Sequence, residues 1–371
     1  MADTMKKVLI IIGKLYVGGA ERVGRDIGYF ADPERFEIHY LVYGDDVGAY
    51  ERELAEKGCR LIHMAPPSAG YAAYWRALTK LIRDEKYDVI HAHTMFSSGW
   101  AMMAGKKYGV PIRIAHSHSI RGNEKRGLVK NTYEKTMRRL VLRYATCCVG
   151  CGRGAGEWLF GAAAFREKGT LIYNGIGLDR FVFDAGIRRK RRGEAGLEDK
   201  FLIGHAGHLA QVKNQRFLLE LMPRILEKKP NAFLLLLGGG ADRAMLEEKI
   251  RELGLEDHVR MMGSVGNVHE WLSAMDVFVF PSLYEGMPLA MIEAQTNGLP
   301  CVISDRIPDD VHLTDLVTAL SLEDSPERWA VAICGAARSD PARYAVRMRE
   351  LGFDTAGMLE KIYALYEGRT L

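Results

Sequence analysis

Two glutamates, Glu285 and Glu293, stand on either side of a turn that follows an apolar run ending at Phe280. The segment Pro288–Gly298 is expected to form a helix, since proline suits a first helical turn and glycine a left-handed cap. Backbone N–H groups at Met287–Ala290 would then lack helical partners and could hold a phosphate. Carboxylates on both sides accept hydrogen bonds from hydroxyl groups. This pattern favours a ligand that carries both phosphate and sugar.

Three glycine-rich turns follow expected strands, at Gly13–Gly19, Gly238–Gly240 and Gly263–Val268. Glycine lets the backbone approach an anion closely, and the start of a helix favours negative charge. The spacing Gly13, Gly18, Gly19 does not fit the G-x-G-x-x-G dinucleotide fingerprint, and the sequence contains no P-loop motif. The turns therefore predict a nucleotide lying over a sheet edge, without dehydrogenase or P-loop chemistry.

Two pairs of histidines follow apolar runs, His91 with His93 and His116 with His118. Alternate residues of a strand point to the same side, so both rings of a pair could point toward a ligand cleft. A pair of this kind could also bind a metal, but no carboxylate or cysteine is spaced to complete such a site. We expect structural or substrate-contacting roles, and the sequence leaves open whether His116 or His118 faces the substrate.

Short apolar runs alternate with longer stretches of helical periodicity along the chain. The expected strands are Val8–Ile12, Ile38–Tyr43, Val89–His91, Ile112–Ala115, Thr146–Val149, Phe201–Gly204, Phe233–Leu237, Val259–Met262, Val277–Phe280 and Pro300–Ile303. This alternation is typical of α/β domains with parallel sheets. The basic run Arg188–Arg192 interrupts the pattern and is expected to be a solvated linker or helix end near a hinge at residues 180–200. We predict two doubly wound domains with a ligand cleft beyond the strand ends.

Length and composition agree with two globular domains. The chain has 371 residues, of which 48% are apolar and 26% charged, and its formal net charge is +4. That charge does not indicate a nucleic-acid partner. Six cysteines, no recognisable leader sequence and no apolar run of membrane-spanning length favour a cytoplasmic location.

A local basic segment lies within this nearly neutral chain, at residues 121–143. It contains Arg121, Lys125, Arg126, Lys130, Lys135, Arg138, Arg139 and Arg143, with apolar residues at helical spacing among them. A basic amphipathic helix can lie on an anionic membrane face. The alternative is a solvated helix whose apolar stripe packs inside the first domain.

Several motifs in order resemble those of glycosyltransferase family 4, the retaining transferases of GT-B fold. They are Gly18–Arg22 (GGAER), Asp88–His93 (DVIHAH), Asn174–Ile176 with Arg180 and Phe181, Gly204–Gly207 with Lys213 and Asn214, and Glu285 with Glu293 (E-x7-E). The resemblance covers nearly the whole chain and is greatest for the subgroup that builds bacterial exopolysaccharide and capsule. It implies two Rossmann-like domains facing each other across a cleft. The implied ranges are an acceptor-side domain at 1–180, a donor-binding domain at 181–352 and a helix at 353–371 that returns to the first domain.

The resemblance also implies roles for individual residues. Glu285 would bind the transferred sugar, Glu293 the ribose, and Lys213 the phosphates as the nucleotide departs. His116 or His118 would contact the reacting sugar. The remaining donor-binding positions are Gly18, Gly19, His208, Gly263, Asn267, Val268, Gly286, Met287, Pro288, Leu289 and Ala290. The donor would be a nucleoside diphosphate sugar, with UDP expected, and the acceptor a glycan or lipid-linked saccharide. No metal or other cofactor is expected.

The sequence departs from the family pattern at three positions. His208 stands where arginine is usual, Gly177 replaces an aspartate, and Val212 replaces the glutamine before Lys213. A histidine is mostly neutral at pH 7, so the charge that His208 offers a diphosphate depends on its pKa in the complex. Two rival functions follow: a nucleotide-sugar epimerase of GT-B type, and a catalytically weak subunit that only binds a nucleotide sugar.

Overall fold

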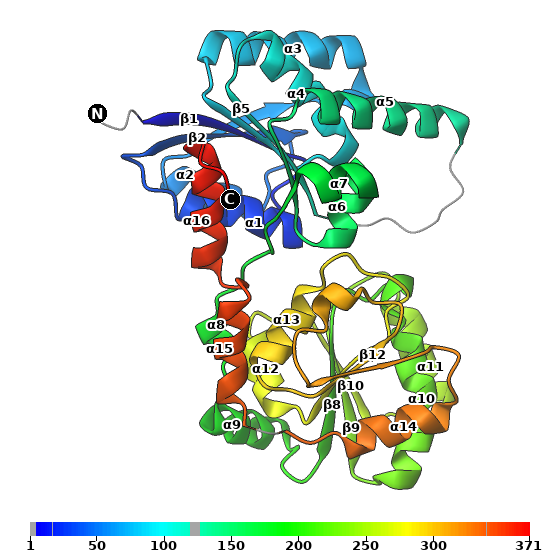
Figure 1. Cartoon of the computed structure of the whole chain (residues 1–371). Coiled ribbons are helices and arrows are strands. Elements are labelled where there is room, and N and C mark those ends of the chain that lie inside the picture. The colour runs from blue at the N-terminus through cyan, green and yellow to red at the C-terminus, as the bar shows by residue number, and fades with distance from the viewer. Residues whose placement is uncertain (1–4, 17, 119–126, 339) are drawn as a thin grey trace. The chain divides into compact units, whose positions relative to one another are not determined.

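The computed structural model describes residues 5–16, 18–118, 127–338 and 340–371, and it divides into two compact units. Unit 1 comprises residues 1–175 and 355–371, and unit 2 comprises residues 176–354. The sequence predicted domain borders at residues 180 and 352, whereas unit 2 begins at residue 176 and ends at residue 354. The short helix α8 (Leu178–Phe181) therefore belongs to unit 2. Each unit is a parallel sheet with helices on both faces (Figure 1).

Unit 1 contains a seven-stranded parallel sheet in the order β3-β2-β1-β4-β5-β6-β7. Its strands are β1 (Lys6–Ile12), β2 (Phe36–Tyr43), β3 (Arg60–Met64), β4 (Val89–Ala92), β5 (Ile112–Ser117), β6 (Cys147–Gly150) and β7 (Gly169–Leu171). Its helices are α1 (Gly19–Tyr29), α2 (Glu51–Glu56), α3 (Tyr71–Glu85), α4 (Ser98–Lys107), α5 (Leu128–Tyr144), α6 (Arg153–Phe160), α7 (Ala162–Lys168) and α16 (Thr355–Tyr366).

The central strand β1 shows why the expected strands are apolar throughout. Val8 and Ile10 pack with residues of α1 and α16, whereas Leu9 and Ile11 pack on the other face with residues of α3 and α4. Both faces of a central strand are covered in a doubly wound sheet, so polar alternation is absent. The C-terminal helix α16 closes one of these faces, and the Tyr363 hydroxyl donates to the backbone oxygen of Ile27 at 2.8 Å.

Unit 2 contains a six-stranded parallel sheet in the order β10-β9-β8-β11-β12-β13. Its strands are β8 (Phe201–Ala206), β9 (Ala232–Leu237), β10 (Val259–Gly263), β11 (Val277–Phe280), β12 (Cys301–Ser304) and β13 (Val317–Leu320). Besides α8, its helices are α9 (Ala185–Ala195), α10 (Gln215–Lys228), α11 (Arg243–Glu252), α12 (Val268–Ala274), α13 (Leu289–Thr296), α14 (Pro326–Gly335) and α15 (Ala342–Glu350). In both units the strand order reverses beside the first strand, which is the switch point where doubly wound sheets bind ligands.

The basic run Arg188–Arg192 is not a linker, so that alternative was wrong, whereas the alternative of a helix end fits Arg192, which lies in the last turn of a helix. It lies in α9, which packs against α12 within unit 2. Arg188 and Arg192 both form ion pairs with Asp276, at 2.5 and 2.6 Å, and only 9% of Arg192 is exposed. Guanidinium groups can be buried when a carboxylate and backbone oxygens satisfy their donors.

Candidate functional site

The carboxyl ends of β8, β9, β10 and β11 lie at one edge of the unit 2 sheet, and the loops after them form a pocket of about 280 Å³. The pocket is lined by Ala206, Gly207, Leu237, Gly238, Ser264, Val265, Val268, Ala290 and Glu293. Both glycine-rich turns that the sequence placed in this unit, Gly238–Gly240 and Gly263–Val268, contribute to it. The predicted donor residues Val268, Ala290 and Glu293 are among the lining residues, whereas the others of the set are not.

Gly238, which lines the pocket, and the nearby Gly263 both occupy positions that favour glycine. Gly238 has φ +140°, and a Cβ on it would lie 2.0 Å from the backbone oxygen of Gly207. Gly263 has φ +69°, a left-handed conformation that favours glycine. Its carbonyl accepts from the Gly238 amide at 2.8 Å, which joins the loops after β9 and β10. At Gly238 a ligand in the pocket can therefore approach the backbone closely.

Lys213 and Glu285 are 72 positions apart in sequence, yet Nζ of Lys213 lies 2.6 Å from Oε1 of Glu285. Two contacts between their loops bring them together. The amide of Leu283 donates to the backbone oxygen of Val212 at 2.8 Å. The side-chain amide of Asn214 donates to the backbone oxygen of Pro281 at 3.2 Å. The ion pair is part-buried, with 19% of the lysine and 12% of the glutamate side chain exposed.

This ion pair lies next to the pocket. A Cβ on Gly207, which lines the pocket, would be 3.6 Å from Cε of Lys213. The ammonium group also lies 4.9 Å from the centre of the Phe280 ring. A cation and a carboxylate are thus held beside the pocket by neighbouring backbone, which is the arrangement expected for contacts to phosphate and sugar.

The start of α13 differs slightly from the sequence-based expectation. Pro288 has extended backbone angles and precedes the helix, which begins at Leu289. Proline has no N–H group, and the amide of Met291 donates to the Pro288 carbonyl at 3.0 Å. The amides of Leu289 and Ala290 are therefore the first-turn donors that face no helical carbonyl. The helix ends before Gly298, whose φ of +67° confirms the predicted left-handed cap.

Other predicted donor residues occupy the same loops. Gly286 and the buried Met287 lie between Glu285 and α13, and the exposed His208 follows Gly207. The side chain of Asn267 donates to Glu270 at 2.7 Å, so its amide group is already engaged within unit 2. Sequence reasoning named the turns that contain Gly238, Ser264 and Val265, but it did not select Ala206, Gly207 or Leu237 as binding residues. Their position at or just after the end of an expected strand was the signal that pointed to these three.

A larger cavity of about 520 Å³ exists in unit 2, lined by His312–Asp315, Arg343, Tyr344 and Arg347. It lies where the chain enters β13, at the amino ends of the strands. Ligands of doubly wound sheets bind at the carboxyl ends, so the smaller pocket is the candidate site.

The remaining predicted residues lie in unit 1. Gly18 caps α1, the first helix after β1, and Gly19 is its first residue, so helix amides there could meet an anion. His116 is 1% exposed and is enclosed among other histidines, whereas His118 is only partly buried. Of this pair His118 is thus the more accessible to a substrate. Burial lowers the pKa of His118 to about 4, so its ring is neutral at pH 7.

Comparison with known proteins shows which family the chain belongs to. Residues 17–180 match the family described as "Glycosyltransferase Family 4", and residues 187–347 match "Glycosyl transferases group 1". The chain is 33% identical to EpsF of Bacillus subtilis (strain 168), a protein named as a glycosyltransferase, over 98% of this chain and 97% of EpsF. The chain belongs to glycosyltransferase family 4. It is therefore a transferase enzyme, as the motifs predicted.

Further relatives and solved structures agree with this assignment. The capsular polysaccharide biosynthesis glycosyltransferase CapH of Staphylococcus aureus is 26% identical over 89% of this chain and 90% of CapH. The Escherichia coli UDP-Gal:alpha-D-GlcNAc-diphosphoundecaprenol alpha-1,3-galactosyltransferase is 28% identical over 62% of this chain and 60% of its own. Anabaena HepE, solved in complex with UDP, has a TM-score of 0.80 at 21% identity and covers 98% of this chain and 100% of its own. These likenesses confirm the predicted GT-B fold.

Proposed function

We propose that this family 4 enzyme transfers a sugar from a UDP-sugar, with retention of anomeric configuration, to a saccharide acceptor in bacterial surface polysaccharide synthesis. The observation that carries the proposal is the unit 2 pocket with Glu293 in its wall and the Lys213–Glu285 pair beside it. HepE was solved with UDP and with UDP-glucose, and the name of CapH refers to capsular polysaccharide. The Escherichia coli relative takes UDP-Gal and a lipid-linked acceptor by its name, which supports a lipid-linked saccharide here.

In the proposed complex Glu293 accepts from the ribose, Glu285 accepts from hydroxyls of the transferred sugar, and the amides of Leu289 and Ala290 hold the diphosphate. Donor binding then separates Lys213 from Glu285, because the ammonium group turns toward phosphate and the carboxylate toward hydroxyls. Lys213 stabilises the negative charge that grows on the departing UDP.

The transfer step proposed for this site is a front-face substitution. The bond from the anomeric carbon to the diphosphate oxygen breaks, and the acceptor oxygen bonds to the same face of that carbon. The acceptor proton passes to the departing diphosphate. Since an ammonium group and amides neutralise that diphosphate, we propose that no divalent cation is needed there.

The test is turnover by the purified full chain with a panel of UDP-sugars and lipid-linked saccharides, without added Mg²⁺ or Mn²⁺. Release of UDP together with an α-linked product supports the proposal. Interconversion of the donor sugar without transfer would instead show an epimerase, and binding of the donor without turnover a binding subunit. Absolute dependence on added Mg²⁺ would contradict the cation-free step.

We also propose that α5 contacts an anionic membrane surface from the cytoplasmic side. Leu128 and Val129 are each 86% exposed at the start of the helix, and Lys130, Lys135 and Arg139 are exposed along it. Exposed apolar residues beside cations favour an interfacial position. Among the residues that the structure describes, no helix has the length and apolar character needed to cross a membrane.

The structure limits which residues of the basic segment can take part in this contact. Met137 and Val141 pack in the unit 1 core, as the alternative interpretation predicted, and Arg138 donates to the backbone oxygens of Trp158 and Leu159. Arg121, Lys125 and Arg126 lie outside the described residues. Co-sedimentation with phosphatidylglycerol vesicles should be lost when Lys130, Lys135 and Arg139 are changed to glutamine. Unchanged co-sedimentation would contradict the proposal.

A further inference from the structure

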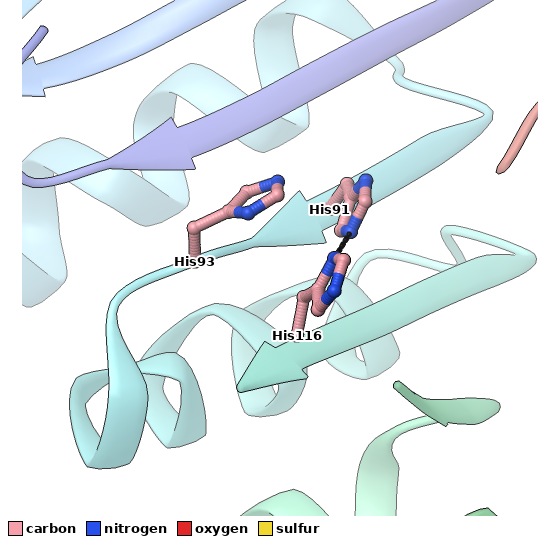
Figure 2. Close-up of side chains that lie close together, drawn as sticks. All are labelled: His91, His93 and His116. Atoms are coloured by element: carbon pink, nitrogen blue, oxygen red, sulfur yellow. Dashed lines mark hydrogen bonds between the residues drawn. The ribbon is translucent and has the colours of Figure 1, made fainter. Parts of the chain in front are cut away.

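Unit 1 holds four histidine rings at the carboxyl ends of its adjacent strands β4 and β5. The parallel register pairs His91 with Ile114 and Ala92 with Ala115, so His93 continues opposite His116. His91 and His116 are both on the face whose core includes Val89 and Ile114, since alternate residues share a face. Figure 2 shows His91, His93 and His116 converging from the two strands. The sequence placed each pair on a strand but did not join the pairs into one cluster.

The rings form a continuous group. The ring centres of His91 and His93 are 4.2 Å apart, and those of His93 and His116 are 5.1 Å apart. His91, His93 and His116 are 0%, 7% and 1% exposed. One nitrogen of each of these three residues lies within 4.8 Å of those of the other two. Three imidazoles buried this closely can act on one small ligand.

The hydrogen bonds inside the group do not satisfy every ring nitrogen. His91 Nε2 lies 3.1 Å from His116 Nδ1, and His93 Nδ1 lies 2.7 Å from His118 Nε2. Within the described part of the chain, Nε2 of His93 and Nε2 of His116 have no hydrogen-bond partner. A buried polar atom without a partner costs free energy, so it calls for an explanation such as an ion or ordered water.

A contact outside the trio orients His91. Its Nδ1 lies 2.7 Å from the hydroxyl of Tyr366, which comes from the C-terminal helix α16. When Nδ1 carries the proton and donates to that oxygen, the Nε2 lone pair points into the group toward His116. Histidines that bind metals are commonly fixed by such a hydrogen bond from their second nitrogen.

We infer that His91, His93 and His116 form a binding site for a zinc-class transition-metal ion in unit 1. Bonds of about 2.0–2.1 Å from zinc to nitrogen put two ligands of a tetrahedral site roughly 3.3 Å apart. The 3.1 Å between His91 Nε2 and His116 Nδ1 is close to this value, and His93 supplies the third nitrogen of a set whose members lie within 4.8 Å of one another.

The donor set selects the class of ion. Imidazole nitrogens suit zinc, copper, nickel and cobalt, whereas Mg²⁺ and Ca²⁺ require oxygen ligands. Three neutral histidines leave a fourth position for water or for His118, so the site is of the open type. Its ligands all come from unit 1, whereas the residues proposed to hold the nucleotide of the donor come from unit 2.

Metal binding by the full chain tests this inference without any glycosyltransferase assay. After treatment with a chelator, the protein is dialysed against Zn²⁺, and Co²⁺ serves as an absorbing probe of coordination. We expect one ion per chain, a visible absorption of four- or five-coordinate Co²⁺, and a melting temperature raised by roughly 5–10 °C at saturating Zn²⁺. His63→Ala, which alters a partly exposed histidine of the same unit, serves as the control and should bind equally.

Two variants decide the outcome. His116→Ala should lose the Co²⁺ absorption, and circular dichroism together with the thermal shift by UDP reports whether the chain is still folded. Should that variant not fold, Tyr366→Phe keeps the ring of the tyrosine and should weaken metal affinity by about 10-fold. Zinc content no higher in the wild type than in His116→Ala, or equal zinc affinity of the wild type and Tyr366→Phe, would overturn the inference without contradicting the donor site proposed in unit 2.

Discussion

The two units have the same kind of sheet but opposite chemistry at its carboxyl edge. In unit 2 that edge carries glycines, bare amides and one lysine–glutamate pair around a pocket of about 280 Å³. In unit 1 it carries Gly18 and Gly19 at the start of α1 and a group of four histidines, of which His91, His93 and His116 are buried. The parallel topology therefore determines where a ligand binds, and the residues after each strand determine which ligand it is.

The functional residues of the two units also differ in how deeply they are buried. Glu285 and Lys213 keep some exposure, so water or a ligand can replace either partner of the ion pair. His91 and His116 are almost fully buried, and burial lowers the pKa of both, that of His91 to about 3. We infer that the unit 2 edge is built for exchange of a large polar ligand and the unit 1 edge for a fixed arrangement of neutral rings.

The largest effect is expected from Glu285→Ala in unit 2. Loss of the carboxylate removes the contact to the transferred sugar and leaves Lys213 without its partner, so kcat should fall by roughly 10³-fold or more. Steady-state kinetics with the preferred UDP-sugar measures this, and UDP binding should remain. Glu256→Ala, an exposed glutamate of the same unit, is the control. Full activity of the Glu285 variant would refute the site assignment.

A smaller loss is expected from His118→Ala in unit 1, the accessible member of its pair. If His118 contacts the reacting sugar, as the resemblance to the family implies, its removal should lower kcat by about 10²-fold, with the KM for donor nearly unchanged. The comparison is sharpened by His116→Ala, which should mainly reduce stability, by about 1–3 kcal/mol, because it removes a buried ring. If His116→Ala keeps wild-type stability while losing turnover, the assignment of the two histidines is reversed.

Unit 2 also contains one fully buried histidine, His205, which tests how far burial alone affects stability. Burial lowers its pKa to about 4, and its ring contacts the Val279 carbonyl and the Gln215 amide group, with the Lys213 charge nearby. The pKa of histidine in the unfolded chain is near 6.5. Between pH 6.5 and pH 4 the unfolded chain therefore binds more protons than the folded one, so the free energy of unfolding decreases as the pH falls through this range. We predict a loss of about 2 kcal/mol at pH 5 relative to pH 7.5.

Hydrogen exchange of the β8 and β11 amides, corrected for intrinsic rates, measures this loss within unit 2. The His205→Gln variant should show a shallower dependence on pH, because it has no ring to protonate. Equal pH dependence in the variant and the wild type would show that His205 is not the group responsible.

The smallest effect is expected from His208→Arg. The exposed ring follows Gly207, which lines the donor pocket, so a permanent charge at this position should tighten UDP binding by several-fold. Isothermal titration with UDP measures the change, and His258→Arg, at a histidine outside the pocket, serves as control. Unchanged affinity would mean that the histidine at 208 does not weaken the donor site.

Much of the fold could be predicted because central strands are visible in the sequence as short apolar runs. All ten expected strands exist, since a strand covered on both faces is continuously apolar. The three strands that the sequence did not reveal, β3, β7 and β13, are all at sheet edges. Edge strands are only partly covered, so Arg60 and Thr318 interrupt their apolar pattern.

The site could be predicted only in part, because residue types are visible in sequence and contacts are not. The E-x7-E spacing located Glu285 and Glu293, but it gave no sign that Lys213 would pair with Glu285 through loops tied at Leu283 and Val212. Nor could spacing show that Asp276 neutralises Arg188, because Asp276 lies far away in the sequence, directly before β11. Long-range partners of charged side chains depend on strand order, which a single sequence does not display.

Hydrogen–deuterium exchange of the full chain with and without UDP tests the central claim most directly, namely that the donor binds at the carboxyl edge of unit 2. We predict that UDP slows exchange at Gly238–Gly240, at Ser264–Val268 and at Leu289–Met291, because ligand atoms shield these amides. Protection confined to the cavity around His312–Asp315 and Arg343, with no change at these three segments, would contradict it.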